Sequence, residues 1–248
     1  MRILATNEVK TATITALTET PGYAFDTALK EKRRSRKGRT LSKSNQTFVF
    51  NLGSAKAISY FVLIDHNLTA TAVIHLQANA TNVWTAPTID ITVTYGTYLL
   101  HEFTSTTSYR YWRVTIHDAN NTNDYIQFSK IYLGAYLQLP YMSKEHKIPT
   151  VSTSSVDRSN SLQSYGDPGT LYKKASINYK NITNTDRLLI DAALRLTDIY
   201  TPFFIIIWEA DLTLEPPLYV ILTTMPDWTR ADQIGLKWTL TLSFEETF

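Results

Sequence analysis

The densest chemical feature of the sequence is a basic segment, residues 30–39, near the start of the chain. Its one acid is Glu31, its formal charge is +6, and its seven bases are Lys30, Lys32, Arg33, Arg34, Arg36, Lys37 and Arg39. Clustered arginines and lysines neutralise phosphates or dock onto acidic protein surfaces. No aromatic residue interrupts the segment, so an exposed loop or a protein-docking loop ranks above nucleic-acid binding. The candidate ligand-binding or partner-binding residues are Arg33, Arg34, Arg36, Lys37 and Arg39.

The net charge of the whole chain hides an asymmetry. The formal charge is +2, from 24 basic and 22 acidic residues, so the residues outside the basic segment sum to −4. Residues 181–248 contain ten acids and four bases, a net charge of −6. The two ends of the chain therefore carry opposite charges, which favours docking of one copy onto the acidic part of another.

Trp84 is the candidate for binding a sugar. Carbohydrate sites combine an aromatic face with a few fixed polar groups, and the stretch Asn82-Val83-Trp84-Thr85 offers both. A large aromatic residue near a strand end can instead close the core of a sandwich. Both interpretations of Trp84 stay open at the level of sequence.

The run from Asp118 to Asp124 is rich in oxygen ligands of the kind that calcium prefers. Asp118, Asn120 and Asp124 are its candidate ligands. The run lacks the glycine and the final glutamate of an EF-hand loop, and asparagine and aspartate are common in plain turns. We therefore expect a turn with no metal and no cofactor, and calcium is the alternative.

Catalytic patterns are missing from the sequence. The five histidines are scattered without metal-ligand spacing, and the chain has no cysteine and no glycine-rich phosphate loop. The triplet Asp65-His66-Asn67 follows an apolar run, where polar residues commonly complete a turn. We expect a protein that is not an enzyme.

The elements that would position these residues are mostly strands. Residues 47–137 contain many short β segments, and Trp112, Val114 and Ile116 alternate with polar residues, as in a sandwich or barrel. Residues 137–169 are rich in Ser, Thr, Pro and Gly and are typical of a linker or extended arm. These patterns predict a β-sandwich over residues 1–137, a linker or arm over 138–169 and a second domain over 170–248.

The second domain has an α+β pattern. Alternation predicts strands over 175–179 and 234–245, and apolar runs predict strands over 203–208 and 218–224. A helix is expected near 185–196, capped by Asn184 or Thr185, because apolar residues recur there at helical spacing: Leu188, Leu189, Ala192 and Leu196. We expect this helix to pack on an antiparallel sheet. No apolar run is long enough for a signal or a membrane span, so synthesis in a cytoplasm without membrane insertion is expected.

Residues 48–134 resemble a galactose-binding-like domain of the discoidin and coagulation-factor C type. The similar pieces are Asn51-Leu52-Gly53, the strand 58–64, Tyr109-Arg110-Tyr111-Trp112-Arg113-Val114 and the closing stretch 125–134. The resemblance implies a jelly-roll sandwich whose loops before the Asn51 strand lie at the ligand-binding end. Such domains usually have two cysteines and an aspartate where this chain has Asn51, so a family calcium site cannot be transferred to that position.

The whole chain is similar to structural proteins of tailed bacteriophages. The similarity rests on Ile64-Asp65-His66-Asn67-Leu68, on Arg110–Arg113 and on an acidic α+β part ending in residues 240–246. It implies a virion component, often of the tail, whose partners are other virion proteins and copies of itself. We therefore predict a phage tail structural protein acting through subunit assembly. A module that binds host glycans at the tail tip is the alternative.

Overall fold

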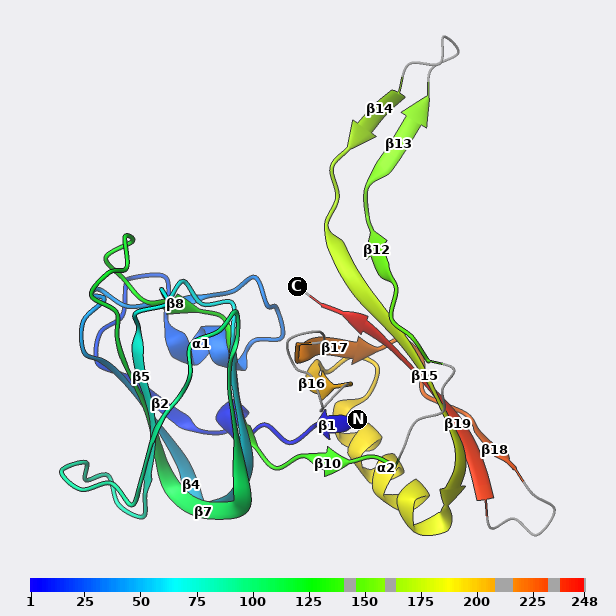
Figure 1. Cartoon of the computed structure of the whole chain (residues 1–248), viewed down its shortest axis with the longest axis horizontal. Helices are drawn as coiled ribbons and strands as arrows, with labels where there is room; N and C mark the ends of the chain where they lie inside the picture. The colour runs from blue at the N-terminus through cyan, green and yellow to red at the C-terminus, as the bar shows by residue number, and fades with distance from the viewer. Residues whose placement is uncertain (141–145, 159–163, 208–215, 232–236, 248) are drawn as a thin grey trace. The chain divides into compact units, whose positions relative to one another are not determined.

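The computed structural model describes residues 1–140, 146–158, 164–207, 216–231 and 237–247. They form two compact units, one of Leu4–Tyr136 and one that joins Met1–Ile3 to Leu137–Thr247. We call the first the sandwich and the second the arm unit (Figure 1). Antiparallel strand pairs dominate both units, which confirms the predicted mainly β fold class. Among the described residues, no helix is both long and apolar enough to span a bilayer.

The sandwich is built around two long strands that pair with each other. A six-stranded sheet runs in the order β2-β4-β7-β5-β6, and β9 pairs with the other end of β4. Its strands are β2 (Thr13–Ala16), β4 (Gln46–Ile64), β5 (Val73–Asn79), β6 (Ile89–Thr92), β7 (Leu99–His117) and β9 (Lys130–Gly134). Two short strands, β3 (Gly38–Arg39) and β8 (Gln127–Phe128), form a separate pair. Because β4 and β7 are each 19 residues long, they link all parts of this sheet.

Alternation along β4 and β7 separates a core face from an outer face. Phe48 and Phe50 of β4 and Trp112, Val114 and Ile116 of β7 are buried in the same core cluster. The predicted alternation of β7 is thereby confirmed. The residues between them point to the outer face of the sheet, because successive side chains of a strand alternate in direction.

A short helix seats the basic segment on this core. Helix α1 (Phe25–Lys30) follows a 3-10 turn, η1 (Glu8–Lys10), and was not expected from the sequence. The Phe25 ring packs against Phe48 and Phe128, with ring centroids 4.7 and 4.6 Å apart. Gly38 lies on this ring so closely that a Cβ atom there would stand 2.2 Å from it. Only glycine therefore lets the chain return from the basic segment to β3 across Phe25.

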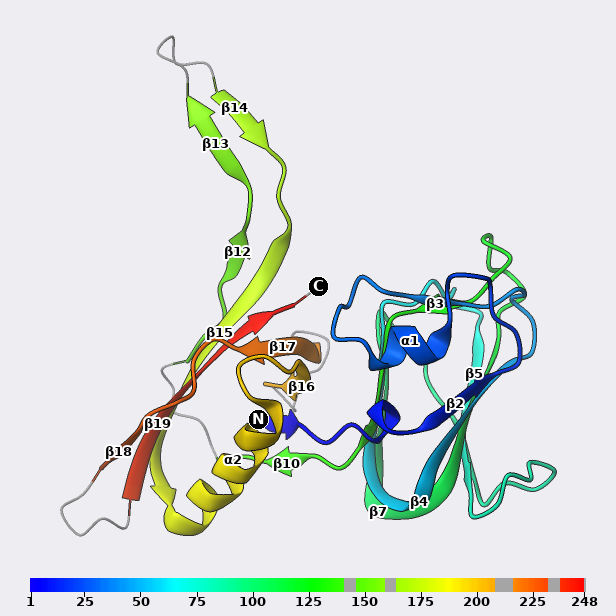
Figure 2. The ribbon, with the colours of Figure 1, turned by 180° about the vertical axis from the view of Figure 1, so that it is seen from behind.

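The arm unit has a nine-stranded sheet and one long hairpin. Its strands are β1 (Arg2–Leu4), β10 (Leu137–Gln138), β11 (His146–Lys147), β12 (Thr150–Ser152), β13 (Ser155–Arg158), β14 (Ser164–Asp167), β15 (Leu171–Thr183), β16 (Phe203–Ile206), β17 (Leu218–Leu222), β18 (Trp228–Arg230) and β19 (Lys237–Glu246). Within residues 138–169, where we predicted a linker or arm, β12 pairs with β15 and β13 pairs with β14 (Figures 1 and 2). The predicted strand positions 208 and 234–236 lie outside the described residues.

Helix α2 (Asn184–Thr197) presents a different face to the sheet from the one expected. Thr183, not Asn184 or Thr185, caps it by accepting a hydrogen bond from the Asp186 backbone N–H. Its buried residues are Ile190, Ala193, Leu194 and Thr197, while Leu188, Leu189 and Leu196 are 69%, 50% and 64% exposed. The leucine row that predicted the helix therefore faces away from the described core of the unit.

Candidate functional site

Three basic side chains of the basic segment, those of Arg36, Lys37 and Arg39, line a hollow at one end of the sandwich. The hollow has a volume of about 470 Å³ and is lined by Gly22, Tyr23, Ser35, Arg36, Lys37, Arg39 and Gln127. None of these lining residues is acidic, so the lining offers no carboxylate that could neutralise the positive charges of Arg36, Lys37 and Arg39. The name hollow is kept below for this site.

Arg39 is the best-fixed side chain of the hollow. Its guanidinium carbon lies 4.2 Å from the centre of the Tyr23 ring and 4.1 Å from that of Tyr125. Nε and Nη2 of Arg39 donate to Oε1 of Gln127 at 3.2 and 2.8 Å, and the two residues face each other across the β3–β8 pair. Two stacked rings and a shared amide acceptor leave the guanidinium little freedom to move.

A buried lysine, Lys130, anchors the end of helix α1, where the basic segment begins. Nζ of Lys130 donates to the backbone carbonyls of Ala28 and Glu31, where α1 ends. This position suits a cation, since the C-terminal end of a helix carries a partial negative charge. Burial lowers the pKa of Lys130 to about 8, although the carboxylates of Glu31 and Asp65 act in the opposite direction.

Arg34 holds the basic segment to a neighbouring loop. Its Nε and Nη2 donate to the two carboxylate oxygens of Asp65 at 2.7 and 2.8 Å, and Ser129 adds a third hydrogen bond at 2.6 Å. Partial burial opposes ionisation of Asp65, but the hydrogen bonds from Arg34 and Ser129 outweigh it and lower the pKa of the carboxyl. Arg34 thus has a structural role, because it binds the basic segment to Asp65. Arg33 lies outside the lining of the hollow. Its side chain is 76% exposed, and its Nη2 is 3.8 Å from Oε2 of Glu31.

The candidate calcium ligands serve other purposes in the structure. Asp118 is fully buried and accepts hydrogen bonds from the backbone N–H and hydroxyl of Thr69 at 2.8 and 2.5 Å. Asn120 donates to Thr71, while Asp124 is 83% exposed and pairs with Lys43 at 2.9 Å. Within the described part of the chain, no three His, Cys, Asp or Glu side chains gather as they would around a metal ion.

Trp84 lies in the loop between β5 and β6, at the other end of the sandwich from β3 and β8 (Figures 1 and 2). Its ring is half-buried, and the Arg113 guanidinium covers it at 4.5 Å, while its Nε1 donates to Oδ1 of Asn82 at 2.7 Å. The core is filled instead by Trp112, which is fully buried. Trp84 is therefore neither part of the hollow nor the plug of the core.

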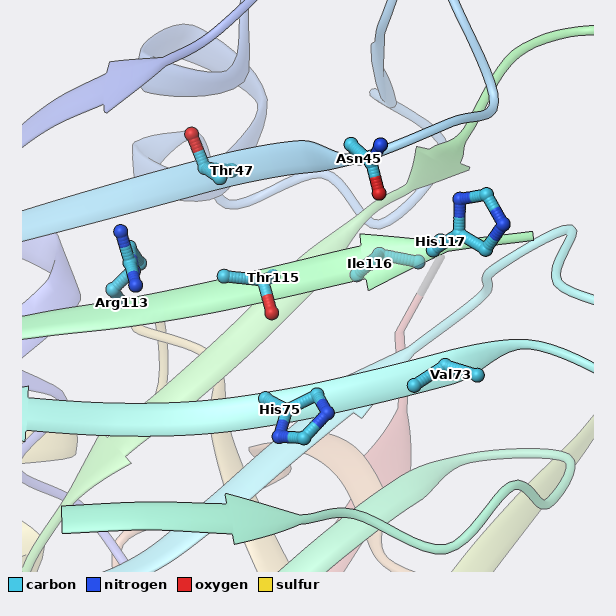
Figure 3. Close-up of a pocket in the computed structure, with 8 residues that line it drawn as sticks. All are labelled: Asn45, Thr47, Val73, His75, Arg113, Thr115, Ile116 and His117. Atoms are coloured by element: carbon cyan, nitrogen blue, oxygen red, sulfur yellow. The ribbon is translucent and has the colours of Figure 1, made fainter. Parts of the chain in front are cut away.

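Arg113 leads to a second concave site on the outer face of the sheet. This sheet-face groove has a volume of about 430 Å³ and lies across β4, β7 and β5, where Thr47, His75, Arg113, Thr115 and His117 line it (Figure 3). None of these residues was among the predicted site residues. The signal that could have found them is the outer-face alternation of three strands, but it requires knowing that these strands are neighbours.

A chain of polar contacts orients Arg113 at one end of the groove. Nε of Arg113 donates to Oε1 of Gln77 at 2.7 Å, and Nε2 of Gln77 donates to Asp90 at 2.8 Å. The other oxygen of Asp90 is 2.8 Å from Nδ1 of His75. Partial burial opposes ionisation of Asp90, yet the hydrogen bonds from Gln77 and His75 and the charge of Arg113 lower the pKa of this carboxyl.

The sequence matches no protein-family model and no curated protein. Among solved structures, the lectin domain of lectinolysin complexed with Lewis B antigen is 14% identical, with a TM-score of 0.43 over 52% of this chain and 95% of that one. A fucose-binding module of Streptococcus pneumoniae is 10% identical, with a TM-score of 0.42 over 52% and 94%. The family 32 carbohydrate-binding module of NanJ from C. perfringens, in complex with galactose, is 13% identical, with a TM-score of 0.42 over 55% and 100%. The likeness covers about half of this chain and gives no residue a role.

Proposed function

We propose that the sandwich is a glycan-binding module whose hollow takes the sulfate or phosphate group of an acidic glycan. The observation that carries this proposal is the immobilised guanidinium of Arg39, with the charged side chains of Arg36 and Lys37 lining the same hollow. A cation that is already fixed loses little conformational freedom when an anion binds, so more of the interaction energy appears as affinity.

The arrangement of donors suits a compact anion with several oxygens. Nη1 of Arg39 is not used by Gln127, whose Oε1 is bound by Nε and Nη2. Hydrogen bonds between a charged donor and an anion contribute about 1.5–3 kcal/mol each. Three neighbouring cations without an acid in the lining favour an anionic group with several oxygens, such as sulfate or phosphate, over a neutral polar group.

A sugar fits the hollow better than a nucleic acid does. The volume of about 470 Å³ lies within the range of small-ligand sites. Nucleic-acid binding draws its affinity from several phosphates along a track, whereas this chain has one basic segment and a net charge of +2. The exposed Tyr23 ring offers an apolar edge beside the cations, as a sugar ring requires, and residues 48–134 resemble galactose-binding-like domains in sequence.

A glycan array with sulfated, phosphorylated, carboxylated and neutral members tests the proposal on the full chain. We expect saturable binding of sulfated or phosphorylated glycans that falls at least tenfold in Arg39→Gln. The matched control is Arg33→Gln, which removes the same charge from the same segment at a position outside the lining of the hollow. A blank array, or equal losses in both variants, would overturn the proposal.

A second candidate function is favoured by the exposed leucines of α2. Leu188, Leu189 and Leu196, together with Ile199 and Tyr200, leave a row of apolar side chains exposed in the arm unit. Such rows are usual at protein interfaces. We propose that a second copy of this chain covers the row, because residues 181–248 carry −6 and the basic segment of another copy carries +6. Copies joined in this way would build a virion component, such as part of a phage tail, in the host cytoplasm.

Sedimentation of the full chain over a range of concentrations tests this assembly. We expect oligomers that dissociate when Leu188 and Leu196 are both replaced by Gln, and that persist in the control Leu41→Gln. Leu41 is as exposed as Leu196, at 64%, but lies in the sandwich. A monomer at every concentration, or an unchanged oligomer in the double variant, would rule out the assembly through α2.

A further inference from the structure

The sheet-face groove has the features of a binding site that is separate from the hollow. Its walls are outer-face side chains of three neighbouring strands, and the register places Thr47 opposite Thr115 and Thr115 opposite His75 in one row across the sheet. The adjacent row places Arg113 opposite Gln77. From Arg113 to His117 the groove follows β7 for about 13 Å, at roughly 3.3 Å per residue.

The contacts of Arg113 fix the position of its side chain but contribute little to the stability of the fold. It stacks on Trp84 and donates to Gln77, which is itself oriented by Asp90 and, through Asp90, by His75. Exposed polar pairs of this kind contribute only about 0–1 kcal/mol to folding. This chain of hydrogen bonds fixes one guanidinium while it adds little to the stability of the fold. Such an arrangement is typical of a preorganised binding site.

Donors that point into the groove are still available. Nε is the one nitrogen of Arg113 for which the described residues supply an acceptor, so both Nη groups are free to donate. The hydroxyls of Thr47 and Thr115 likewise make no hydrogen bond within the described ranges. Val73, 47% exposed, adds an apolar wall beside these polar groups. A planar guanidinium with two free Nη groups matches the two oxygens of a carboxylate, and hydroxyls match the hydroxyls of a sugar.

We propose that the sheet-face groove binds the carboxylate of a uronic-acid residue within an extended polysaccharide, with Arg113 as the carboxylate clamp. The Thr47 and Thr115 hydroxyls hydrogen-bond to the sugar, and Trp84 fixes the clamp. Asp90, ionised and hydrogen-bonded to Gln77, adds negative charge behind Arg113. It therefore disfavours groups with close to two negative charges, such as a phosphate monoester, while it tolerates the single charge of a carboxylate.

The test is an NMR titration of the full chain with an oligogalacturonate, with a neutral galactose oligosaccharide as the matched ligand. The resonances to follow are the indole N–H of Trp84 and the side-chain Nε–H of Arg113. We expect saturable shifts of both with the oligogalacturonate and none with the neutral sugar. Arg113→Gln should weaken binding at least tenfold, whereas Arg110→Gln, on the same strand but hydrogen-bonded to Asn51, should leave it unchanged.

A second variant protects the test against misfolding. Thr115→Val keeps the branched shape of a strand residue and removes one hydroxyl, and we expect it to weaken binding about threefold. Arg39→Gln should not change the shifts at Trp84, so a failure of the hollow and a failure of the groove give different results. Equal shifts with both sugars, no shifts with the oligogalacturonate, or an unchanged affinity in Arg113→Gln would each overturn the inference.

Discussion

The hollow and the sheet-face groove hold an arginine in the same way but surround it with different charges. In each site a guanidinium stacks on an aromatic ring and donates through Nε to a glutamine directly opposite on the neighbouring strand: Arg39 to Gln127, and Arg113 to Gln77. Cross-strand neighbours lie about 5 Å apart, which lets a glutamine orient an arginine without a loop.

The surroundings of the two arginines decide what each can bind. Arg39 has two tyrosine rings close to its guanidinium and two further cations in the lining, while Arg113 has one tryptophan and a carboxylate behind its glutamine partner. In the two proposals, the same kind of clamp therefore takes a sulfate or phosphate group in the hollow and a single carboxylate in the groove. The proposals differ because the neighbours of each fixed arginine carry different charges.

The largest expected effect comes from making the hollow resemble the groove. Lys37→Glu puts an acid beside Arg39 and reverses a charge in the lining. We expect the affinity for a sulfated glycan to fall by roughly 50-fold, because two unit charges a few ångströms apart interact by a few kcal/mol near a protein surface. Isothermal titration calorimetry measures it, with Arg33→Glu as the control for an equal change of net charge. If Lys37→Glu and Arg33→Glu lower the affinity equally, the position of Lys37 in the lining of the hollow contributes nothing to binding.

The second prediction concerns Lys130, the buried lysine that anchors the end of α1 where the basic segment begins. The pKa of Lys130 is about 8 in the folded chain and about 10.5 when unfolded, so the unfolded state binds more protons between these values. The free energy of unfolding therefore rises with pH across this window, by about 1–2 kcal/mol relative to Lys130→Met. Urea denaturation at several pH values in this window measures the difference. Parallel pH profiles of the two proteins would show that Lys130 is not the titrating group.

A higher salt concentration should weaken binding at both sites, and it should weaken binding at the hollow more than at the groove. Raising the ionic strength from about 0.05 M to about 0.5 M screens charges that are several ångströms apart. The hollow depends on three cations, so we expect its affinity for a sulfated glycan to fall about fivefold. The groove depends on one guanidinium and hydroxyl groups, and its affinity for an oligogalacturonate should fall about twofold. Equal losses would contradict the difference in charge between the sites.

The last expected effect, smaller than the fivefold loss of the hollow in salt, is that of Trp84. Trp84→Ala removes the ring under Arg113 but leaves the hydrogen bond to Gln77, so the clamp becomes looser without being lost. We expect binding of an oligogalacturonate to weaken about threefold and binding of a sulfated glycan in the hollow to stay unchanged. The same two titrations measure both values. An effect of Trp84→Ala on the hollow would break the independence of the two sites.

The sandwich could be predicted from the sequence because apolar and polar residues alternate along its β segments, although the predicted short segments are joined in the structure into the 19-residue strands β4 and β7. The outer-face positions of β7, including Arg113, follow from the same pattern as Trp112 and Val114. The clamp of Arg39 could not be predicted, since β3 and β8 have two residues each, too few for a period, and Gln127 lies 88 positions away. Hydrogen bonds over such distances depend on the tertiary fold.

The helix of the arm unit shows a different limit. Helical spacing located α2 within one residue at each end, but it did not indicate which face is buried. Ile190 and Leu194 are buried, while Leu188, Leu189 and Leu196 are exposed, although leucine stands on both faces. The spacing of apolar residues indicates that a helix forms, but only the packing of the folded chain shows which face of the helix is buried.

Gly38 is the first residue of strand β3 of the sandwich and directly follows residues of the basic segment that line the hollow. It is the point where the chain crosses the Phe25 ring without room for a side chain, and the residues just before it line the hollow. We expect substitutions at 35–37 to alter the binding proposed for the hollow, whereas any side chain at 38 would clash with Phe25 and displace the chain around it. If the hollow binds the proposed anion, residues 35–37 form a loop whose specificity can be changed by substitution while Gly38 and the fold around Phe25 stay as they are.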